Sequence, residues 1–503
     1  MCGILFYKGS KLKINELKSS LDLMNHRGPD FSAIKKIDDV FLGHKRLSII
    51  DLDKRSNQPF EIGSYNIIFN GEIYNYKEII ASEKFILKTS SDTEVLLRLY
   101  MKYKEKCLDK LNGMFSFVIY NAETKDYFIA RDRLGIKPLY IYEKGEEVLV
   151  SSEIAPILSL RKSELDEFAI RQYKKLRMTV NNYTLYKDIK FFPSAHYRIN
   201  KYNFRYWDLD IIQKENPDEE ELKDLIHNSI FIRQRADVEF GAYLSGGLDS
   251  SILAAVSKPK HSWTIGFDIL NEFKWSKIVS EKIGTNHHAI TFINEKFKEI
   301  TKWMVEKRKE TLCVPNEVLL YSMTKQVKNH NTVILSGEGA DELFWGYDRI
   351  FRWAINQKDL SISGFDEKYC YGSKKDNEVI DFALENSKGK TPIDKLGYYF
   401  QITHLQGLLR RLDNSSMLCS VEARVPFVDH RLVEFMSGRS FEYRMGKSFK
   451  EPLKRLFSDI LPKEIIERKK MGFPVPLDII FETDTLLEGW DKWFDFNLKL
   501  LNN

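Results

Sequence analysis

The sequence is poor in the features that mark secreted, zinc-binding or membrane-embedded proteins. It has only five cysteines among 503 residues, and no two of them form a Cys-x-x-Cys pair. An odd number of widely spaced cysteines indicates neither a disulfide framework nor a zinc site. No apolar run approaches the roughly 20 residues that a membrane span needs, and the polar residues soon after Met1 do not fit a signal peptide. We therefore expect no membrane partner and a location in the reducing cytoplasm.

The chain also lacks a strong charge of one sign. Its 77 lysines and arginines stand against 72 aspartates and glutamates, and the net charge of +5 is spread along the chain. Nucleic-acid binding is not expected, because it would call for a clustered basic face. Hydrophobic content of 43% is ordinary for a soluble globular protein, and the length predicts about two to four domains. The composition does not fix the oligomeric state, and a homodimer is compatible with it.

The most informative stretch is a glycine-containing loop, Ser245-Gly246-Gly247-Leu248-Asp249-Ser250. It lies between residues 238–244, which predict a buried strand, and residues 251–256, which predict a helix. A strand, a glycine turn and a helix together aim unpaired backbone N–H groups at an anion. The glycines allow close approach to a phosphate, and the serines add hydroxyl donors. Asp249 would repel a bare phosphate, but it suits a phosphate-bound Mg²⁺.

This loop does not have the Gly-Lys-Ser/Thr ending of a Walker loop. It resembles instead the pyrophosphate loop, Ser-Gly-Gly-x-Asp-Ser, of enzymes that cleave ATP between the α and β phosphates. A strand-to-helix turn whose glycines only relieve strain is the alternative, and a lone Gly-Gly pair would favour it. The match at every specified position favours ATP. The residues expected to contact ATP are Ser245, Gly246, Gly247, Asp249 and Ser250.

Cys2 is the second informative residue. If Met1 is removed, which a small second side chain permits, Cys2 carries both a thiol and a free α-amine. The amine titrates at about 7.7–8.0, so it can act as general base for its own thiol at neutral pH. The alternative is a cysteine that merely happens to be second. The motifs that follow decide between the two.

Four such motifs follow within the first hundred residues. They are His26-Arg27-Gly28-Pro29-Asp30, residues 43–51, Asn70-Gly71-Glu72, and Ser91-Asp92-Thr93-Glu94. Short β-like segments lie between and after them, at residues 40–42, 65–69, 115–120, 127–130 and 139–142. The spacing, with turn residues such as Asn70-Gly71 and Asn121-Ala122-Glu123, predicts mainly antiparallel sheets. Apolar spacing in residues 91–103 predicts a helix over one face.

Together these motifs resemble the glutaminase domain of the N-terminal-nucleophile amidotransferases, specifically that of the asparagine synthetases. The resemblance implies that the N-terminal cysteine attacks the glutamine amide and releases ammonia. It implies an oxyanion hole formed by the Asn70 side chain and the Gly71 N–H group. It assigns the glutamine carboxylate to Arg46, whose fork suits a carboxylate, and the α-amine to Glu72 and Asp92.

Each of these residues has a plainer alternative. Asn70-Gly71 would suit a turn, Arg46 a surface charge, and Asp92 a helix N-cap, alone or together with ligand binding. The glutaminase reading is favoured because four motifs of one family appear in one order. Residues 131–140 also match the family, and there we expect a structural role near the domain interface.

The acidic segment 207–221 predicts a boundary between a glutaminase domain of residues 1–207 and a synthetase domain of residues 208–503, with a helix from about Glu219. Beyond it, predicted strands alternate with helices. Those strands are residues 238–244, 262–267, 288–291 and 332–335. The alternation predicts a doubly wound parallel sheet, which binds ligands at the carboxyl ends of its strands. We thus expect an α+β domain of stacked antiparallel sheets followed by an α/β ATP-pyrophosphatase domain.

A second glycine-rich loop, Ser336-Gly337-Glu338-Gly339-Ala340-Asp341-Glu342, ends the fourth predicted strand. Ser336 and Gly337 are expected at ATP, and Asp341 is expected to share Mg²⁺ with Asp249. In asparagine synthetases the residue corresponding to Glu338 lies by the reacting acyl group. The strand at residues 262–267 matches the one whose backbone reads adenine, with Ile265 as the expected contact. A plain strand-end turn is the alternative for each loop.

Two later motifs extend the resemblance over nearly the whole chain. The last residues that match are 468–474. Residues 420–429 correspond to a region along the internal ammonia route of relatives, although Glu422 and Arg424 would equally suit a buried ion pair. Residues 446–450 resemble the segment whose lysine contacts pyrophosphate and stabilises the acyl transition state. Lys450 fits that lysine better than Lys447 does.

The resemblance implies a glutamine-hydrolysing asparagine synthetase. Such an enzyme amidates aspartate through an acyl-adenylate, uses ATP and Mg²⁺, and releases AMP, pyrophosphate and glutamate. A glutaminase with a degenerate second site and a non-enzymatic binding protein are disfavoured, because both loops and Cys2 are intact.

The acceptor is the open question, with aspartate the leading candidate. Relatives have an acidic, Ser/Thr-rich stretch where this chain has Thr311–Val318, and many have glycine where it has Trp345. The indole would either reshape the pocket for a larger acid or pack in the core. The alternative acceptor is a sugar uronate or a peptide or other small-molecule acid.

Overall fold

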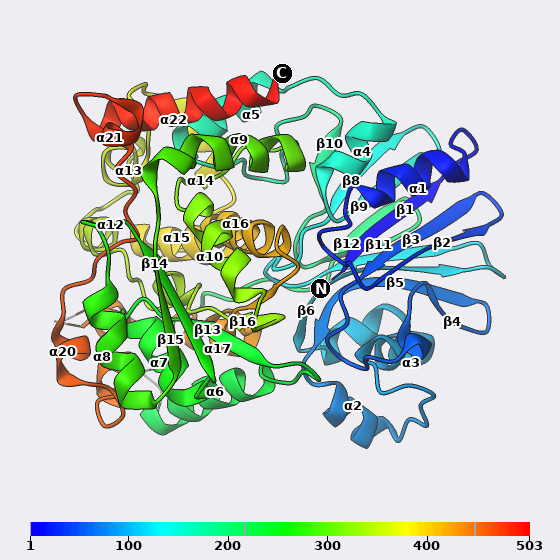
Figure 1. Ribbon diagram of the computed structural model, residues 1–503, viewed down its shortest axis with the longest axis horizontal. Helices are drawn as coiled ribbons and strands as arrows, with labels where there is room; N and C mark the ends of the chain where they lie inside the picture. Colours follow the sequence, from blue (N-terminus) through cyan, green and yellow to red (C-terminus); the bar gives the residue numbers. More distant parts are fainter. Residues whose placement is uncertain (1, 216–217, 447–448, 503) are drawn as a thin grey trace.

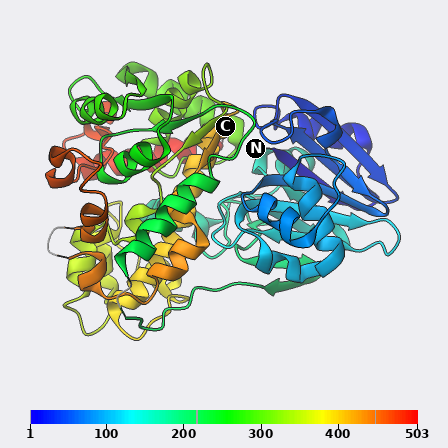
Figure 2. The same ribbon diagram turned by 90° about the horizontal axis from the view of Figure 1, so that it is seen from below.

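The computed structural model describes residues 2–215, 218–446 and 449–502. Its two halves lie side by side, with the antiparallel sheets of the first half facing the parallel sheet and helices of the second (Figures 1 and 2). Lys447, the alternative to Lys450, lies outside the described residues. No helix within the described ranges is both long and apolar enough to cross a membrane.

The first half holds two six-stranded sheets in which every strand pair is antiparallel. One sheet has the order β10-β8-β9-β1-β3-β2 and the other β12-β11-β7-β6-β5-β4. The strands of the first sheet are β1 (Gly3–Lys8), β2 (Phe31–Ile37), β3 (Val40–Arg46), β8 (Tyr140–Lys144), β9 (Glu147–Ser151) and β10 (Ile189–Phe191). The strands of the second are β4 (Phe60–Ile62), β5 (Tyr65–Ile73), β6 (Gly113–Asn121), β7 (Tyr127–Arg131), β11 (His196–Ile199) and β12 (Tyr202–Arg205).

The two sheets bury side chains on both of their faces. In β1, Ile4 and Phe6 join the cluster between the sheets, while Leu5 and Tyr7 join the cluster on the other side. This alternation follows from the two-residue period of a strand. Helices cover the outer faces, so β1 is apolar in nearly every position. They are α1 (Ile14–Asp22) and α4 (Ile154–Leu160) on one side, and α2 (Tyr76–Glu83) and α3 (Asp92–Tyr103) on the other.

Two local predictions for this half are wrong. Asn70-Gly71 is not a turn, because β5 continues through both residues and stays paired with β6 as far as Ile73 opposite Gly113. Asp92 is not the N-cap of α3. Ser91 is, and its hydroxyl accepts the Thr93 N–H group. The turn after Asn121 is confirmed, and so is the helix predicted over residues 91–103.

The second half is built on a five-stranded parallel sheet of order β15-β14-β13-β16-β17. Its strands are β13 (Phe240–Tyr243), β14 (His261–Gly266), β15 (Asn286–Thr291), β16 (Val333–Leu335) and β17 (Glu422–Arg424). The doubly wound sheet and four of these strands were predicted from the sequence. The fifth, β17, was not, because three residues with charged ends carry no strand pattern.

Helices surround this sheet and form the rest of the second half. The first of them along the chain are α6 (Glu219–Ile232), α7 (Leu248–Ser257), α8 (Phe273–Ile283), α9 (Phe297–Arg308) and α10 (Glu317–Val327), of which α7, α8 and α10 pack directly on the sheet. The later ones are α11 (Ala340–Leu343), α12 (Asp348–Ala354), α13 (Ile362–Tyr369), α14 (Asn377–Leu384), α15 (Pro392–Tyr398), α16 (Leu405–Met417), α17 (His430–Met436), α18 (Phe441–Arg444), α19 (Glu451–Leu456), α20 (Lys463–Glu467), α21 (Leu477–Phe481) and α22 (Leu486–Leu501). A π-helical turn, Tyr399–His404, joins α15 to α16.

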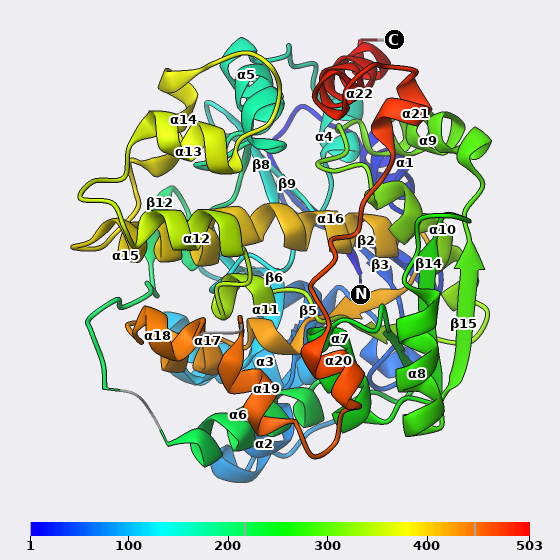
Figure 3. The ribbon, with the colours of Figure 1, turned by 90° about the vertical axis from the view of Figure 1, so that its left-hand side faces the viewer.

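One helix that follows the antiparallel sheets packs on the second half. This helix, α5 (Glu167–Leu176), lies beside α14 and α22 in Figure 3. The Tyr173 hydroxyl donates to the Leu312 carbonyl at 2.8 Å, and Arg171 pairs with Asp376 at 2.8 Å. Because α5 ends at this interface, residues that follow it can reach a cavity in the second half.

Candidate active sites

The loop after β13 has the geometry of an anion cradle. Gly246 has a φ of 75°, and a Cβ there would lie 2.4 Å from the Trp275 carbonyl carbon, so no larger residue fits. The Gly247 N–H group donates to the Ser245 hydroxyl oxygen at 3.2 Å, and the Ser245 and Ser250 hydroxyls are 3.1 Å apart. Helix α7 begins at Leu248, three residues earlier than predicted. Its free N–H groups therefore face the loop.

The loop after β16 meets the loop after β13. A Cβ on Gly337 would lie 3.2 Å from the Ser250 nitrogen, so glycine permits this approach. Lys450 joins the two loops: its ammonium is 2.5 Å from Asp249 and 2.6 Å from Asp341. Lys470 lies 2.5 Å from Asp341 as well. Although burial opposes it, the two ammonium groups hold the pKa of the Asp341 carboxyl well below its usual range.

Glu338 lies in the same loop and is held by Arg411, which bonds to its carboxylate. The Arg411 guanidinium also donates to the Asn316 side-chain oxygen at 3.3 Å. Asn316 belongs to the stretch 311–318, whose Val314 and Pro315 line the same cavity. The departure from the family in this stretch therefore lies at the site and not in a remote loop.

A cavity of about 750 Å³ runs from these loops toward α13 and α22. The predicted ATP contacts Ser245, Gly247, Asp249, Ser250, Ile265, Ser336 and Gly337 line it, as do Glu338, Asp341 and Lys450. The cavity thus brings together residues from loops about 200 positions apart. Its far end is aromatic and cationic, with Tyr347, Tyr369, Tyr371, Arg177 and Lys368.

The other site centres on Cys2, which is buried beside β5. Its backbone N–H group donates to the Asn70 side-chain oxygen at 3.0 Å. The side-chain amide nitrogen of Asn70 is buried and has no hydrogen-bond partner among the described residues. That nitrogen is a free donor beside the sulfur-bearing residue, as an oxyanion hole requires. Burial raises the pKa of the Cys2 thiol, against the effect of the nearby Leu47 N–H group and Arg46.

The Gly71 N–H group points away from β6. The N–H groups of Phe69 and Ile73 donate to the side chains of Gln58 and Asp92, at 2.6 and 2.9 Å. Gly71 lies between them, and alternate residues of a strand direct their N–H groups to the same side. A Cβ on Gly71 would lie 2.1 Å from the Met114 carbonyl oxygen, so the position excludes any side chain.

Arg46 is buried but forms no ion pair with any described carboxylate. Its guanidinium donates to the carbonyl of Asp53 at 2.9 Å, to the Asn57 side chain at 2.8 Å and to the Asp51 carbonyl. These neutral partners fix the orientation of the group without cancelling its charge. A buried, uncompensated guanidinium is suited to an external carboxylate.

Glu72 and Asp92 place two buried carboxyl groups near Cys2. Burial and the charge of Glu422 raise the pKa of the Glu72 carboxyl well above its usual value. Burial also raises the pKa of Asp92, to about 6. Arg424 lies 3.6 Å from Glu72 and bonds to Glu422 at 2.6 Å. The predicted buried ion pair of Glu422 and Arg424 is thus present, and it touches the first site from the second half.

The chain is similar to known proteins over both of its halves. Residues 1–207 match the family model of the glutamine amidotransferase domain, and residues 221–495 match that of asparagine synthase. Asparagine synthetase B of Escherichia coli is 31% identical, over 72% of this chain and 67% of its own length. The chain belongs to the asparagine synthase family.

Other members and neighbours show how broad this family is. The glutamine-hydrolysing asparagine synthetase 1 of Bacillus subtilis is 29% identical over 95% of this chain and 87% of its own length. The amidase chry2 of Gibberella zeae is 26% identical over 85% and 79%. The glutamine phosphoribosylpyrophosphate amidotransferase of B. subtilis covers 51% of this chain at 19% identity, with a TM-score of 0.33 that is too low to add to the assignment. This family member is an amidotransferase of the ligase class that performs glutamine-dependent amidation.

Trp345 does not line the cavity of this asparagine synthase-family protein. Its ring stacks on Phe351 with centroids 5.1 Å apart, and the Arg444 guanidinium lies 4.4 Å from its centroid. It is 4% exposed and belongs to the core cluster of α12 and α15. Of the two roles expected for the indole, core packing is the one observed.

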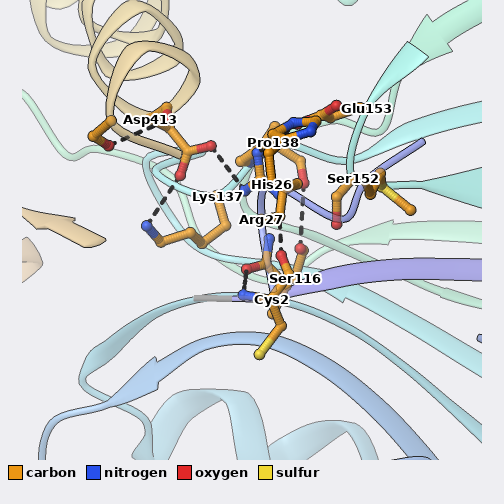
Figure 4. Close-up of polar contacts among 12 residues, drawn as sticks. Cys2, His26, Arg27, Ser116, Lys137, Pro138, Ser152, Glu153 and Asp413 are labelled. Carbon is orange, nitrogen blue, oxygen red and sulfur yellow. Dashed lines mark hydrogen bonds and ion pairs between the residues drawn. The ribbon is translucent and has the colours of Figure 1, made fainter. Parts of the chain in front are cut away.

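Sequence reasoning missed three residues that the structure places at the sites. Arg27 donates to the Cys2 carbonyl at 3.1 Å and pairs with Glu153 and Asp413, so it ties Cys2 to α16 (Figure 4). His404 lines the large cavity and bonds to the Tyr369 hydroxyl at 2.6 Å. Arg177, just after α5, lines it too. Of these three residues, only Arg27 belongs to a motif noted in the sequence, His-Arg-Gly-Pro-Asp.

Proposed function

We propose that the protein amidates aspartate to asparagine, with glutamine as nitrogen donor and ATP cleaved to AMP and pyrophosphate. The observation that carries the proposal is the contact of Lys450 with both Asp249 and Asp341 at the junction of the two glycine-rich loops. This arrangement places a cation and two carboxylates where a triphosphate would lie over the carboxyl ends of β13 and β16. Adenylation of a carboxylate is the chemistry that such a loop serves in the family.

At the first site, Cys2 acts as its own nucleophile and base after loss of Met1. The freed α-amine, held by Asn70 at 3.0 Å, takes the thiol proton, and the sulfur attacks the glutamine amide carbon. The Asn70 amide nitrogen and the Gly71 N–H group stabilise the developing oxyanion. The α-ammonium returns this proton to the departing nitrogen, which leaves as ammonia, and water then hydrolyses the thioester to glutamate. Arg46 holds the substrate carboxylate while Glu72 and Asp92 hold its amine.

At the second site, the loop residues Ser245 to Ser250 bind the phosphates, and Ile265 lies at the adenine. Asp249 and Asp341 fit a Mg²⁺ ion, because one oxygen of Asp249 is buried with no hydrogen-bond partner among the described residues. When bound, the ion neutralises phosphate charge. Lys450 stabilises the charge that develops on the α-phosphate as the acceptor carboxylate attacks and pyrophosphate leaves. Glu338, oriented by Arg411, lies where the acyl group then meets ammonia.

Ammonia passes between the sites inside the protein. The proposed route follows the side chains of β17, because Arg424 contacts Glu72 of the first site while β17 lies beside β16 of the second. These groups are buried, so ammonia on this path is shielded from water and from protonation.

Arg177 is the residue we assign to the acceptor's second charge. Its guanidinium lies 4.1 Å from the Tyr371 ring centroid, and its titratable neighbours are neutral tyrosines, with no carboxylate bonded to it among the described residues. Aspartate offers an α-carboxylate to such a cation. The aromatic wall also favours the second candidate, a larger acid such as a uronate or a peptide carboxylate.

A mass-spectrometric product assay tests the proposal. Purified protein is incubated with ATP-Mg²⁺ and glutamine, with and without aspartate. Asparagine and AMP that appear together, and only with aspartate, are the expected result. Glutamate released without asparagine or AMP would refute aspartate as acceptor. A panel of uronates and peptide acids in the same assay would then test the second candidate.

A further inference from the structure

A second cavity of about 230 Å³ lies between the two halves of the molecule. Its walls come from β7 and β10 of the first half and from the π-helical turn and α16 of the second. Four basic side chains line it: Arg131, Arg205, Lys388 and Arg410. None of the described residues that line it is an aspartate or a glutamate.

Two of these cations lack an acidic partner. Arg410 lies 4.7 Å and Arg131 5.9 Å from the centroid of the same ring, that of Phe191. Arg410 has the Cys313 sulfur at 3.5 Å as a neighbour, and burial raises the pKa of that thiol, which keeps it neutral. Glu310 is the carboxylate whose charge acts on Arg410. It already accepts a hydrogen bond from the Tyr140 hydroxyl at 2.9 Å.

Arg131 is 4% exposed, and three of its N–H groups donate to backbone carbonyls, those of Lys137, Phe192 and Gly135. A guanidinium has five N–H donors, so two remain. Burial lowers the pKa of Arg131 against the opposing charges of Asp132 and Asp413, and the charge of Arg410 adds to the lowering. Arg131 is buried and Arg410 is partly buried, so two cations near one ring repel each other, and an anion between them would reduce the repulsion.

The other two cations, Arg205 and Lys388, share a single carboxylate. Asp208 bonds to both Arg205 and Lys388 and accepts the Tyr398 hydroxyl at 2.9 Å. One carboxylate does not balance two cations, so the cavity keeps a net positive lining. In the same lining, Ser194 accepts a hydrogen bond from the Gln406 amide at 3.2 Å, which leaves its own O–H group free to donate.

We propose that this interdomain cavity binds a small oxyanion, a carboxylate or a phosphate, between Arg410 and Arg131. The guanidinium of Arg410 supplies a planar fork that suits either group. Because one arginine comes from each half, an occupant stabilises the arrangement in which the two halves are in contact. The site is separate from the ATP cavity, whose lining shares none of these residues.

Thermal unfolding with added anion tests this site. Wild type, Arg410→Gln and Arg352→Gln are compared in phosphate, acetate or chloride at one ionic strength, with saturating ATP-Mg²⁺ so that the loop at residues 245–250 takes no phosphate. Arg352 is the matched control, a surface arginine paired with Asp348 and outside the cavity. We expect phosphate or acetate at tenfold excess over Kd to raise Tm by on the order of 1–2 °C in wild type and control, and less than half as much in Arg410→Gln.

Equal rises in all three proteins, or none in wild type, would overturn the proposal. Comparison of the phosphate and acetate arms tells which oxyanion is preferred. Arg410→Lys guards against misfolding, since it keeps the charge but not the fork and is expected to retain part of the shift. A selenate soak of crystals gives a direct reading: an anomalous peak between Arg131 and Arg410 supports the site, and a peak confined to the ATP loop contradicts it.

Discussion

The two sites of this protein differ in what holds their residues in place. Around Cys2, the proposed oxyanion donors Asn70 and Gly71 are neighbours in one strand, and sheet pairing fixes them. Around the ATP loop, Lys450 and Asp249 are 201 residues apart and meet only because two loops converge at the ends of parallel strands. A strand-built site suits one small substrate, while a loop-built site accommodates a nucleotide together with an acceptor that loop changes can alter.

Lys450→Met should give the largest effect and should separate the two sites. Loss of its charge removes stabilisation from the adenylyl-transfer step, so we expect amide formation to fall about 10²- to 10³-fold. Release of glutamate from glutamine should change little, because Cys2 lies in the other half. Lys463→Met, a surface lysine paired with Glu467, is the control. Equal losses of both activities in Lys450→Met would mean that the sites are not separate.

Arg46→Gln tests the strand-built site. Its guanidinium is the buried charge assigned to the glutamine carboxylate, and a charged hydrogen bond contributes about 1.5–3 kcal/mol. We therefore expect kcat/KM for glutamine to fall about 10- to 100-fold, mainly through KM, with ammonia-dependent amidation unchanged. Steady-state kinetics with each nitrogen donor measure this. Arg55→Gln, an exposed arginine of the same loop, should stay near wild type. A lowered kcat at unchanged KM would refute a binding role.

Arg177→Gln tests the acceptor end of the loop-built site. If Arg177 holds the second charge of the acceptor, KM for the acceptor should rise about tenfold, and KM for ATP should not change. Arg352→Gln serves again as control. A variant with the acceptor KM of wild type would show that the second charge is bound elsewhere in the cavity.

Asp92→Asn should give the smallest effect, on stability and its pH dependence. The folded-state pKa of Asp92 is about 6, above its ordinary value of 3.8. Its stabilising contribution is therefore present below pH 3.8 and is lost as pH rises through 6. The asparagine side chain of the variant does not ionise, so it loses no stability over this pH range. Its oxygen can still accept the Ile73 N–H group.

Relative to wild type, the free energy of unfolding of Asp92→Asn should therefore increase by about 1–2 kcal/mol between pH 5 and pH 8. Urea unfolding at both pH values measures it, with the exposed Asp109 changed to asparagine as control. A difference that is the same at both pH values would contradict the raised pKa.

The same contrast explains what the sequence could predict. The loops at residues 245–250 and 336–342 are contiguous motifs, so the sequence could place both at one edge of the sheet, and four of the five parallel strands were predicted with them. Asn70-Gly71 was misread as a turn because the pair has turn chemistry, and only its pairing with β6 shows that the strand continues.

Contacts between residues far apart in the chain could not be predicted from local sequence patterns. Arg27 meets Asp413 across 386 positions, and Arg177 reaches the acceptor cavity only because α5 packs on the second half. The two roles expected for Trp345 could not be separated until its stacking on Phe351 was seen.

The most direct test of a two-site enzyme is the activity of Cys2→Ala with ammonium in place of glutamine. We predict that this variant releases no glutamate from glutamine but forms amide and AMP from ammonium, ATP-Mg²⁺ and the acceptor at about the wild-type ammonia rate. Loss of the ammonium-dependent reaction in a folded Cys2→Ala protein would contradict the account.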